Sequence, residues 1–153
     1  MAYQFKIIPN DELDIIIPLV YELNESKVSK DLLKLRFNEM KNQNYECAGL
    51  FNGSFLIGVA GLWFCTRHYM GKSVELDHVY IMPEHRGKGL GKKFMDWINS
   101  YVKEKGCNAI VVNQKSEIHF NEVSVPLILV EDSREVLGAI AIFKGQQWNF
   151  KGQ

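Results

Sequence analysis

The amino-acid sequence predicts one α/β domain built on a mixed sheet, with elements in the order β-α-α-β-β-β-α-β followed by a C-terminal hairpin. A chain of 153 residues is long enough for a real core, and its 46% hydrophobic and 24% charged residues are typical of soluble globular proteins. Stretches with strand-like and helix-like apolar spacing follow one another without a repeat or linker. We therefore expect residues 1–153 to form a single domain.

Charge and cysteine content exclude several classes of function. Eighteen basic residues balance eighteen acidic ones, so no overall field would attract nucleic acid or an anionic membrane. Cys47, Cys65 and Cys107 form no C-x-x-C pair, and the four histidines show no metal-ligand spacing. We expect free thiols, no disulfide framework and no metal site.

The sequence shows neither a targeting signal nor a membrane segment. Its N-terminus lacks the basic and apolar regions of a signal peptide. No apolar stretch approaches the roughly 20 residues that a membrane helix needs. We therefore expect a cytoplasmic protein with no membrane partner.

The first elements are a strand at Tyr3–Ile8 and a pair of helices. Asn10 is placed to cap the first helix, and Pro18 should kink it because proline removes a backbone donor. The apolar residues that give this helix its spacing are Leu13, Ile16, Ile17 and Val20. A second helix should begin at Ser29. Its apolar face comprises Leu33, Phe37 and Met40.

Three strands come next, and the first two form a hairpin. Asn52-Gly53 lies between the strand-like runs 45–51 and 55–65, and both turn residues tolerate a positive φ. A turn around residues 68–72 then leads into a third strand, 73–82.

The remaining elements are one long amphipathic helix and several short strands. The helix should run from about residue 89 to 105, end at Gly106 and precede a buried strand at 109–112. Its apolar stripe is formed by Leu90, Phe94, Trp97, Ile98 and Tyr101. Beyond this strand we expect a short helical or irregular piece at 116–122, and then two strands, 125–130 and 136–143, around the turn EDSRE.

A glycine-rich turn, RGKGLG at residues 86–91, connects the strand 73–82 to the long helix. A helix N-terminus binds anions readily, and glycines ahead of it let several amides converge on one phosphate. Cationic side chains that would add contacts are Arg86, Lys88, Lys92 and Lys93. The turn predicts a phosphate or pyrophosphate site, although it matches neither a P-loop nor the dinucleotide-binding fingerprint.

The run VELDHVYIMPEHRGKGLGKKFMDWI, residues 74–98, resembles the acetyl-CoA signature of the GCN5-related N-acetyltransferase (GNAT) superfamily. In that family a strand ends in an apolar-x-apolar-x-Pro pattern, here Val79, Ile81 and Pro83. The motif [RQ]-x-x-G-x-[GA] then opens a helix, here from Arg86 to Gly91. With the matching order of elements, the resemblance covers about the first three quarters of the chain. It implies a GNAT-like acyl-CoA N-acyltransferase fold that uses acetyl-CoA (coenzyme A) as co-substrate.

The resemblance also implies roles for the matching positions. Amides of the loop would hold the pyrophosphate of coenzyme A, and backbone groups of the preceding strand would pair with its pantetheine arm. A fixed N–H there would stabilise the carbonyl oxygen as an amine attacks. The strand 109–112 would splay away to admit the arm. The implied cofactor-binding residues are Val79, Ile81, Met82, Arg86, Gly87, Lys88, Gly89, Leu90, Gly91, Lys92 and Asn113.

Two carboxylates on the strand 73–82 are candidate catalytic groups, because the acceptor amine must lose a proton before it attacks. Strand alternation puts Glu75 and Asp77 on one face, which the following odd-numbered residues continue. His78 and Tyr80 would lie on the other face, unless a bulge reverses the phase and turns them into the substrate cleft. The alternative for the carboxylates is a solvated Glu75 and a structural Asp77.

Residues 114–153 depart from the family pattern. Many members carry N-x-x-A-x-x-x-Y-x-x-x-G-F after the strand corresponding to 109–112, and its tyrosine protonates the leaving thiolate. This chain has no tyrosine after Tyr101, and Ser116, His119 and Ser124 do not match the motif. The thiolate would leave unassisted or take its proton from water or another residue. Alternatively, the last forty or so residues pack differently, for instance by exchange between protomers.

The sequence leaves the acceptor open. Glu22 and Glu25 lie near the junction of the first two helices, where they would join the two strand carboxylates in an acidic patch or remain solvated helix ends. We expect a small or amino-acid-like primary amine, with a protein amino group as the alternative. Two other classes stay open: a non-catalytic acetyl-CoA-binding sensor, and an interaction protein with a basic loop and no coenzyme. An open strand edge in the terminal hairpin would also favour a homodimer.

Overall fold

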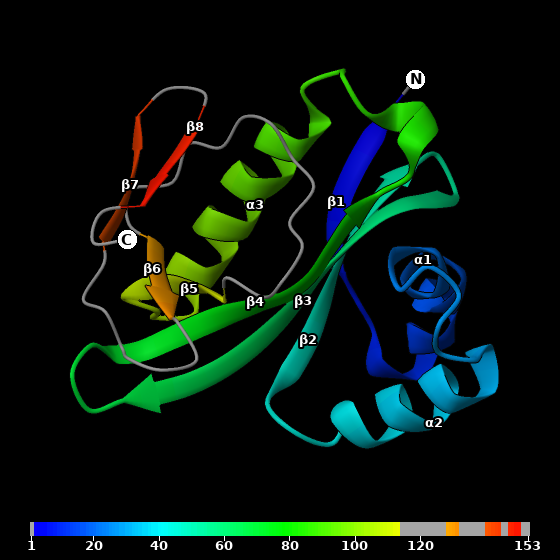
Figure 1. Cartoon of the computed structure of the whole chain (residues 1–153), viewed down its shortest axis with the longest axis horizontal. Helices are drawn as coiled ribbons and strands as arrows, with labels where there is room; N and C mark the ends of the chain where they lie inside the picture. The colour runs from blue at the N-terminus through cyan, green and yellow to red at the C-terminus, as the bar shows by residue number, and fades with distance from the viewer. Residues whose placement is uncertain (1, 114–127, 132–139, 145–146, 151–153) are drawn as a thin grey trace.

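The strands of the protein form one mixed sheet in chain order, from β1 to β8, in a computed structural model that describes residues 2–113, 128–131, 140–144 and 147–150. Helices α1 and α2 cover one face of this sheet and α3 covers the other (Figure 1). The predicted α/β class with a mixed sheet is therefore confirmed.

The elements have the following bounds. The strands are β1 (Tyr3–Ile8), β2 (Tyr45–Asn52), β3 (Phe55–Arg67), β4 (Gly71–Ile81), β5 (Ala109–Asn113), β6 (Ile128–Glu131), β7 (Ile140–Lys144) and β8 (Gln147–Phe150). The helices are the 3-10 helix η1 (Asn10–Ile16), α1 (Ile17–Leu23), α2 (Lys30–Met40), the 3-10 helix η2 (Pro83–His85) and α3 (Leu90–Glu104). None of the helices in the described ranges is long and apolar enough to span a membrane.

The start of the helical region differs from the prediction. Asn10 does not cap a helix: Pro9 holds the cap position of η1, and the Asn10 side chain donates to the carbonyl of Lys41 at 3.1 Å. Pro18 lies in the first turn of α1 instead of kinking a longer helix. Its missing N–H costs nothing there, because amides of a first turn have no partner within the helix. The second helix was predicted to begin at Ser29; α2 begins at Lys30, and Ser29 is its N-cap, with the side chain accepting a hydrogen bond from the amide of Leu32.

The pairing of the strands changes direction at β4. Strands β1 to β4 are antiparallel, β5 runs parallel to both β4 and β6, and β6 to β8 are antiparallel again. The predicted Asn52-Gly53 hairpin is present, with Gly53 at φ 61°. The predicted antiparallel pairing in the C-terminal part is confirmed between β6 and β7, and β8 is an additional strand. The predicted piece at 116–122 lies outside the described residues.

The sheet separates two apolar clusters. The cluster on the α3 side includes Leu62, Leu76, Phe94 and Ile98, all almost completely buried. The cluster on the side of α1 and α2 is built from residues of η1, α1 and α2 and from β-strand side chains such as Tyr45. Because both faces of the sheet are covered, a ligand can reach the backbone of β4 only at its edge and at its end.

Candidate active site

Strand β4 has a neighbour on both edges only in its first half. β5 pairs with it from Ser73 to Leu76, and beyond Leu76 the segment 77–81 is paired with β3 alone within the described residues. The expected separation of the strand 109–112 from β4 is therefore wrong, because all four of its residues pair with residues 73–76 and the pairing stops only beyond Leu76 and Val112. Among the described residues, the backbone groups on this edge have no strand partner, which is the arrangement that an extended ligand could pair with.

A β-bulge lies where the second half of β4 begins. Leu62 faces Leu76 but Ala60 faces Val79, so Gly61 alone stands opposite two residues of β4. Such an extra residue interrupts the alternation of side chains. The simple alternation is therefore wrong beyond Asp77, and the alternative of a bulge that reverses the phase of the strand is confirmed.

The bulge sorts the side chains of β4 into an apolar and a polar set. Val79 and Ile81 pack on the α3 side together with Val74 and Leu76, so they do not continue the face of the carboxylates. The side chains on the side of α1 and α2 are Glu75, Asp77, His78 and Tyr80. This places both candidate carboxylates on the same side as the helix pair.

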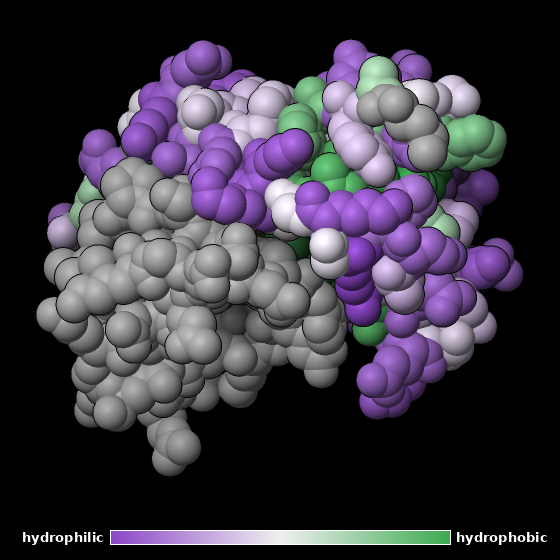
Figure 2. All heavy atoms as spheres, turned by 90° about the horizontal axis from the view of Figure 1, so that it is seen from above, coloured by the Kyte–Doolittle hydropathy of each residue, from purple (hydrophilic) through white to green (hydrophobic). Residues whose placement is uncertain are grey.

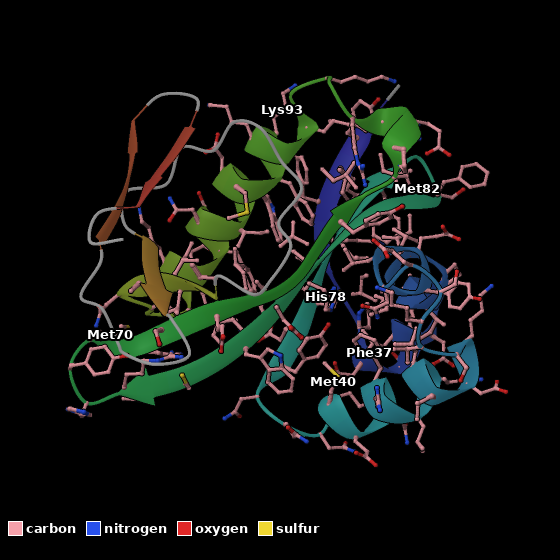
Figure 3. All side chains as sticks on the ribbon, in the orientation of Figure 1. Phe37, Met40, Met70, His78, Met82 and Lys93 are labelled. Carbon is pink, nitrogen blue, oxygen red and sulfur yellow. The ribbon has the colours of Figure 1, made fainter. Side chains whose placement is uncertain are left out.

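His78 occupies the space above Gly61. A Cβ on Gly61 would lie 2.6 Å from two atoms of the imidazole, which is closer than packed atoms allow. The His78 ring is buried, is hydrogen-bonded through Nε2 to the Tyr45 hydroxyl, and meets Phe37 of α2 edge-on with centroids 5.5 Å apart (Figure 3). Burial lowers the pKa of His78 to about 4, and the Asp77 carboxylate opposes this shift only in part. The imidazole is therefore neutral near pH 7.

The two carboxylates have different neighbours. The indole Nε1 of Trp63 donates a hydrogen bond to Oδ2 of Asp77 at 3.1 Å. Glu75 Oε2 lies 3.8 Å from a guanidinium nitrogen of Arg67, so its charge is offset by a cation. Asp77 is thus held by a neutral donor, whereas Glu75 has a cation beside it.

The turn between β4 and α3 presents a row of six successive amides. Gly87 and Gly89 have φ of 77° and 75°, values that glycine adopts without strain. The amides of residues 87–92 donate to no other described backbone group, and the helical pattern begins when Lys93 donates to the carbonyl of Gly89. A Cβ at either glycine would meet no described atom within 4 Å, so the side-chain positions of both glycines face open space in the described part of the molecule. This geometry is that of an anion site at a helix N-terminus.

Arg86 is used differently from the loop residues that follow it. Its amide donates to the carbonyl of Pro83, and its side-chain Nε donates to the carbonyl of Ile81 at 2.7 Å. Its guanidinium lies over the ring of Tyr80, 5.2 Å from the centroid. Arg86 therefore ties the loop back to the end of β4.

The lysines of the loop are accessible. Lys88 and Lys93 are exposed, and Lys92 lies 3.4 Å from Asp96 one turn along α3. Lys93 stands at the end of the molecule where α3 begins (Figure 3), and the described part of this end shows mostly hydrophilic side chains around a smaller apolar area (Figure 2). Positive charge is therefore available beside the free amides.

Most of the other residues predicted to bind the cofactor could contact a ligand only through their backbone. The side chains of Val79, Ile81 and Leu90 are buried in the α3 cluster, which leaves only their backbones for a ligand. The amide of Met82 donates to the carbonyl of Ile57 at 2.8 Å. The backbone of Asn113 pairs with β6, and its side chain lies outside the described part.

Other features predicted from the sequence lie outside or beside this site. Ser116, His119 and Ser124 are outside the described residues. Within the described ranges, no three metal-ligating side chains come close enough to hold an ion. Glu25 is exposed and ion-paired with Lys27 at 3.3 Å.

Glu22 lies closer to the site than Glu25. Burial raises the pKa of the Tyr80 hydroxyl, the Arg86 guanidinium opposes this, and the Glu22 and Glu84 carboxylates add to it. Glu22 is therefore near the end of β4, on the side of the two strand carboxylates.

A cavity of about 680 Å³ lies elsewhere in the molecule. Its lining includes Ile8, Asn44, Glu46, Lys72 and Lys105, and it contains no residue of the segment 77–92. The free amides and the open edge of β4, not this cavity, define the candidate site.

Comparisons with known proteins show what the chain is similar to. Residues 17–127 match the acetyltransferase (GNAT) family. A thialysine N-epsilon-acetyltransferase from Sus scrofa is 23% identical over 90% of this chain and 86% of its own length, and the one from Mus musculus is 26% identical over 69% and 58%. The structure of a GNAT family acetyltransferase from Staphylococcus aureus superimposes with a TM-score of 0.65, at 19% identity over 82% of this chain and 96% of that one. A ribosomal-protein-alanine N-acetyltransferase from Brucella melitensis gives 0.62, at 18% identity over 73% and 79%.

Proposed function

The chain belongs to the acetyltransferase (GNAT) family, and we propose that it transfers an acetyl group from acetyl-CoA to a primary amine of a small or amino-acid-like molecule. One observation carries this proposal. Within the described residues, the second half of β4 has an unpaired edge, and after η2 and Arg86 six successive amides at the start of α3 have no backbone partner. An extended chain that ends in a pyrophosphate fits such a sequence of groups.

The loop would bind the pyrophosphate of the coenzyme. Amides of residues 87–92, which have no backbone partner among the described residues, would bind it, and the absence of side chains at Gly87 and Gly89 would let a phosphate approach the backbone. Lys88 and Lys93 would add charge-assisted contacts. Arg86 would fix the loop to β4 through the carbonyl of Ile81.

The second half of β4 would hold the pantetheine arm and the reacting group. When bound, acetyl-CoA supplies an acetyl thioester whose carbonyl carbon the amine attacks. A backbone N–H on the open edge of β4 would stabilise the negative charge that develops on the carbonyl oxygen. This role needs an amide that no neighbouring strand uses, which the edge beyond Leu76 provides.

Asp77 would remove the proton from the acceptor ammonium, directly or through one water. Its Oδ1 makes no hydrogen bond within the described residues, whereas Oδ2 is held by Trp63. As the new C–N bond forms and the C–S bond breaks, the leaving thiolate would take a proton from water. No family-type tyrosine follows Tyr101 to supply that proton.

The acceptor would be a cationic amine. Asp77, Glu75 and Glu22 lie on the side of β4 that faces the helix pair, and together they would attract an ammonium group. The relatives named for thialysine, which is an amino acid with a side-chain amine, support an acceptor of this size. A protein amino group is the alternative acceptor.

Turnover with a panel of amines tests the proposal. Purified protein is incubated with acetyl-CoA and, in turn, thialysine, lysine, an aliphatic diamine and a lysine-containing peptide, and the products are identified by mass spectrometry. Acetylation of one of the small amines is expected. Binding of acetyl-CoA with no acetylated product would favour the sensor, and acetylation of the peptide alone would point to a protein acceptor.

A further inference from the structure

We infer that Trp63 is a positioning residue for Asp77, and that the buried Tyr45–His78 pair supports it. This inference rests on the proposed function, because it assigns a purpose to the orientation of the Asp77 carboxylate. It concerns three neighbouring strands: Tyr45 lies on β2, Trp63 on β3, and Asp77 with His78 on β4.

The contacts among these four residues form a closed circuit. The Trp63 indole donates to Asp77 at 3.1 Å, and its ring packs on that of Tyr45 with centroids 4.9 Å apart. The Tyr45 hydroxyl is hydrogen-bonded to His78, which is joined to Asp77 by a peptide bond. Tyr45 and Trp63 are also direct partners in the β2–β3 register. The Asp77 carboxylate is therefore held by an indole whose ring is itself packed against a buried, hydrogen-bonded tyrosine.

The bulge makes this circuit possible. Without the extra residue, a β4 that kept Val79 and Ile81 in the α3 cluster would turn Asp77 toward the same apolar cluster. Gly61 permits the bulge, because any side chain there would collide with the imidazole of His78. His78 thus fills the gap opposite Gly61 while Asp77 keeps the face of Glu75.

The chemistry of the four residues suits positioning and not proton transfer. Tyr45 and His78 are almost completely buried, and Nδ1 of His78 has no hydrogen-bond partner within the described residues. The indole N–H of Trp63 can donate but cannot take up a proton. Asp77 is therefore the group of the circuit that can exchange a proton with the acceptor, and one of its oxygens is fixed by Trp63.

A nuclear magnetic resonance measurement tests the contact without relying on activity. The indole Nε1–H signal of Trp63 is assigned with Trp63→Phe and followed in Asp77→Ala. The Trp63 signal is expected to move and to exchange faster with solvent, whereas that of Trp97, which packs between Phe5 and Tyr101, stays in place. An unchanged Trp63 signal would overturn the inference.

Steady-state kinetics test the role. Trp63→Phe keeps an aromatic ring against Tyr45 and removes only the donor, so kcat is expected to fall about tenfold while KM for acetyl-CoA and the unfolding midpoint stay near wild type. The matched control, Trp97→Phe, should leave kcat unchanged. A wild-type kcat in Trp63→Phe, or a rise in KM with kcat intact, would refute a positioning role. If the wild-type protein acetylates no amine, the proposed function and the role fail together, and the indole signal still reports whether the contact exists.

Discussion

The first and second halves of strand β4 differ in how they are paired and in what their residues contribute. The stretch from Ser73 to Leu76 is paired on both edges, and the side chains of Ser73, Val74 and Leu76 are fully buried. The segment 77–81 keeps only β3 as a described neighbour, begins with a bulge and ends at the row of free amides. The first half therefore holds the strand in the sheet. The second half leaves its backbone available to pair with a ligand and the Asp77 carboxylate available to accept a proton.

Substitutions of the adjacent residues Leu76 and Asp77 should separate the two tasks most strongly. Asp77→Asn keeps the size of the side chain and removes its basicity, so kcat/KM for the amine should fall by about 10²–10⁴ with little change in unfolding free energy. Leu76→Ala removes a fully buried side chain and should cost about 2–5 kcal/mol of stability while the folded fraction retains its kcat.

Amine acetylation kinetics and urea unfolding measure both effects. Glu75→Gln is the matched control for the lost carboxylate, because the Glu75 charge is already offset by Arg67. It should reduce kcat/KM less than Asp77→Asn does. Equal effects of the two carboxylate variants on the rate would contradict the distinction between them.

A side chain at position 61 should destabilise the bulge that separates the two halves of β4. Gly61→Ala places a Cβ 2.6 Å from the His78 ring, and the strain of overpacking should cost about 1–3 kcal/mol. The double variant Gly61→Ala with His78→Ala removes the collision, so its stability should be higher than the sum of the two single effects. Thermal unfolding of the four proteins measures this coupling, and strict additivity would show that the ring does not occupy this space.

Because His78 is buried at the bulge, the unfolding free energy of the protein should depend on pH. The pKa of His78 is lowered from 6.5 to about 4 in the folded protein, so the unfolded chain binds more protons between these values. The contribution of neutral, buried His78 to the unfolding free energy is complete above about pH 6.5 and is lost as the pH falls toward 4. The difference in unfolding free energy between the wild type and His78→Gln should therefore shrink over this range. A constant difference would mean that His78 is not buried as a neutral group.

The sequence was a good guide to features set by neighbouring residues. The Asn52-Gly53 hairpin, the start of the second helix near Ser29 and the glycine-rich turn before α3 all depend on local backbone chemistry. The end of α3 before Gly106, at φ 85°, has the same origin.

Features that depend on distant residues were not predictable in this way. The bulge in β4 is permitted by Gly61 on another strand, so alternation along β4 alone gave the wrong face for Val79 and Ile81. The hydrogen bond from Trp63 to Asp77 also joins two strands, and no spacing along either of them indicates it. Asn10 failed as a cap because its side chain is used by Lys41, which follows 31 positions later in the chain.

The most direct test of the proposed site is calorimetric titration with acetyl-CoA of the wild type and of Gly89→Asp. The substitution places a carboxylate in the open space before the free amides, and Gly106→Asp is the matched control, because it too has a positive φ and open surroundings but lies at the other end of α3. We expect binding by the wild type and by Gly106→Asp, and at least about tenfold weaker binding by Gly89→Asp because its charge repels the pyrophosphate. Absence of binding by the wild type, or equal binding by all three proteins, would contradict the assignment of the 86–92 loop as the coenzyme site.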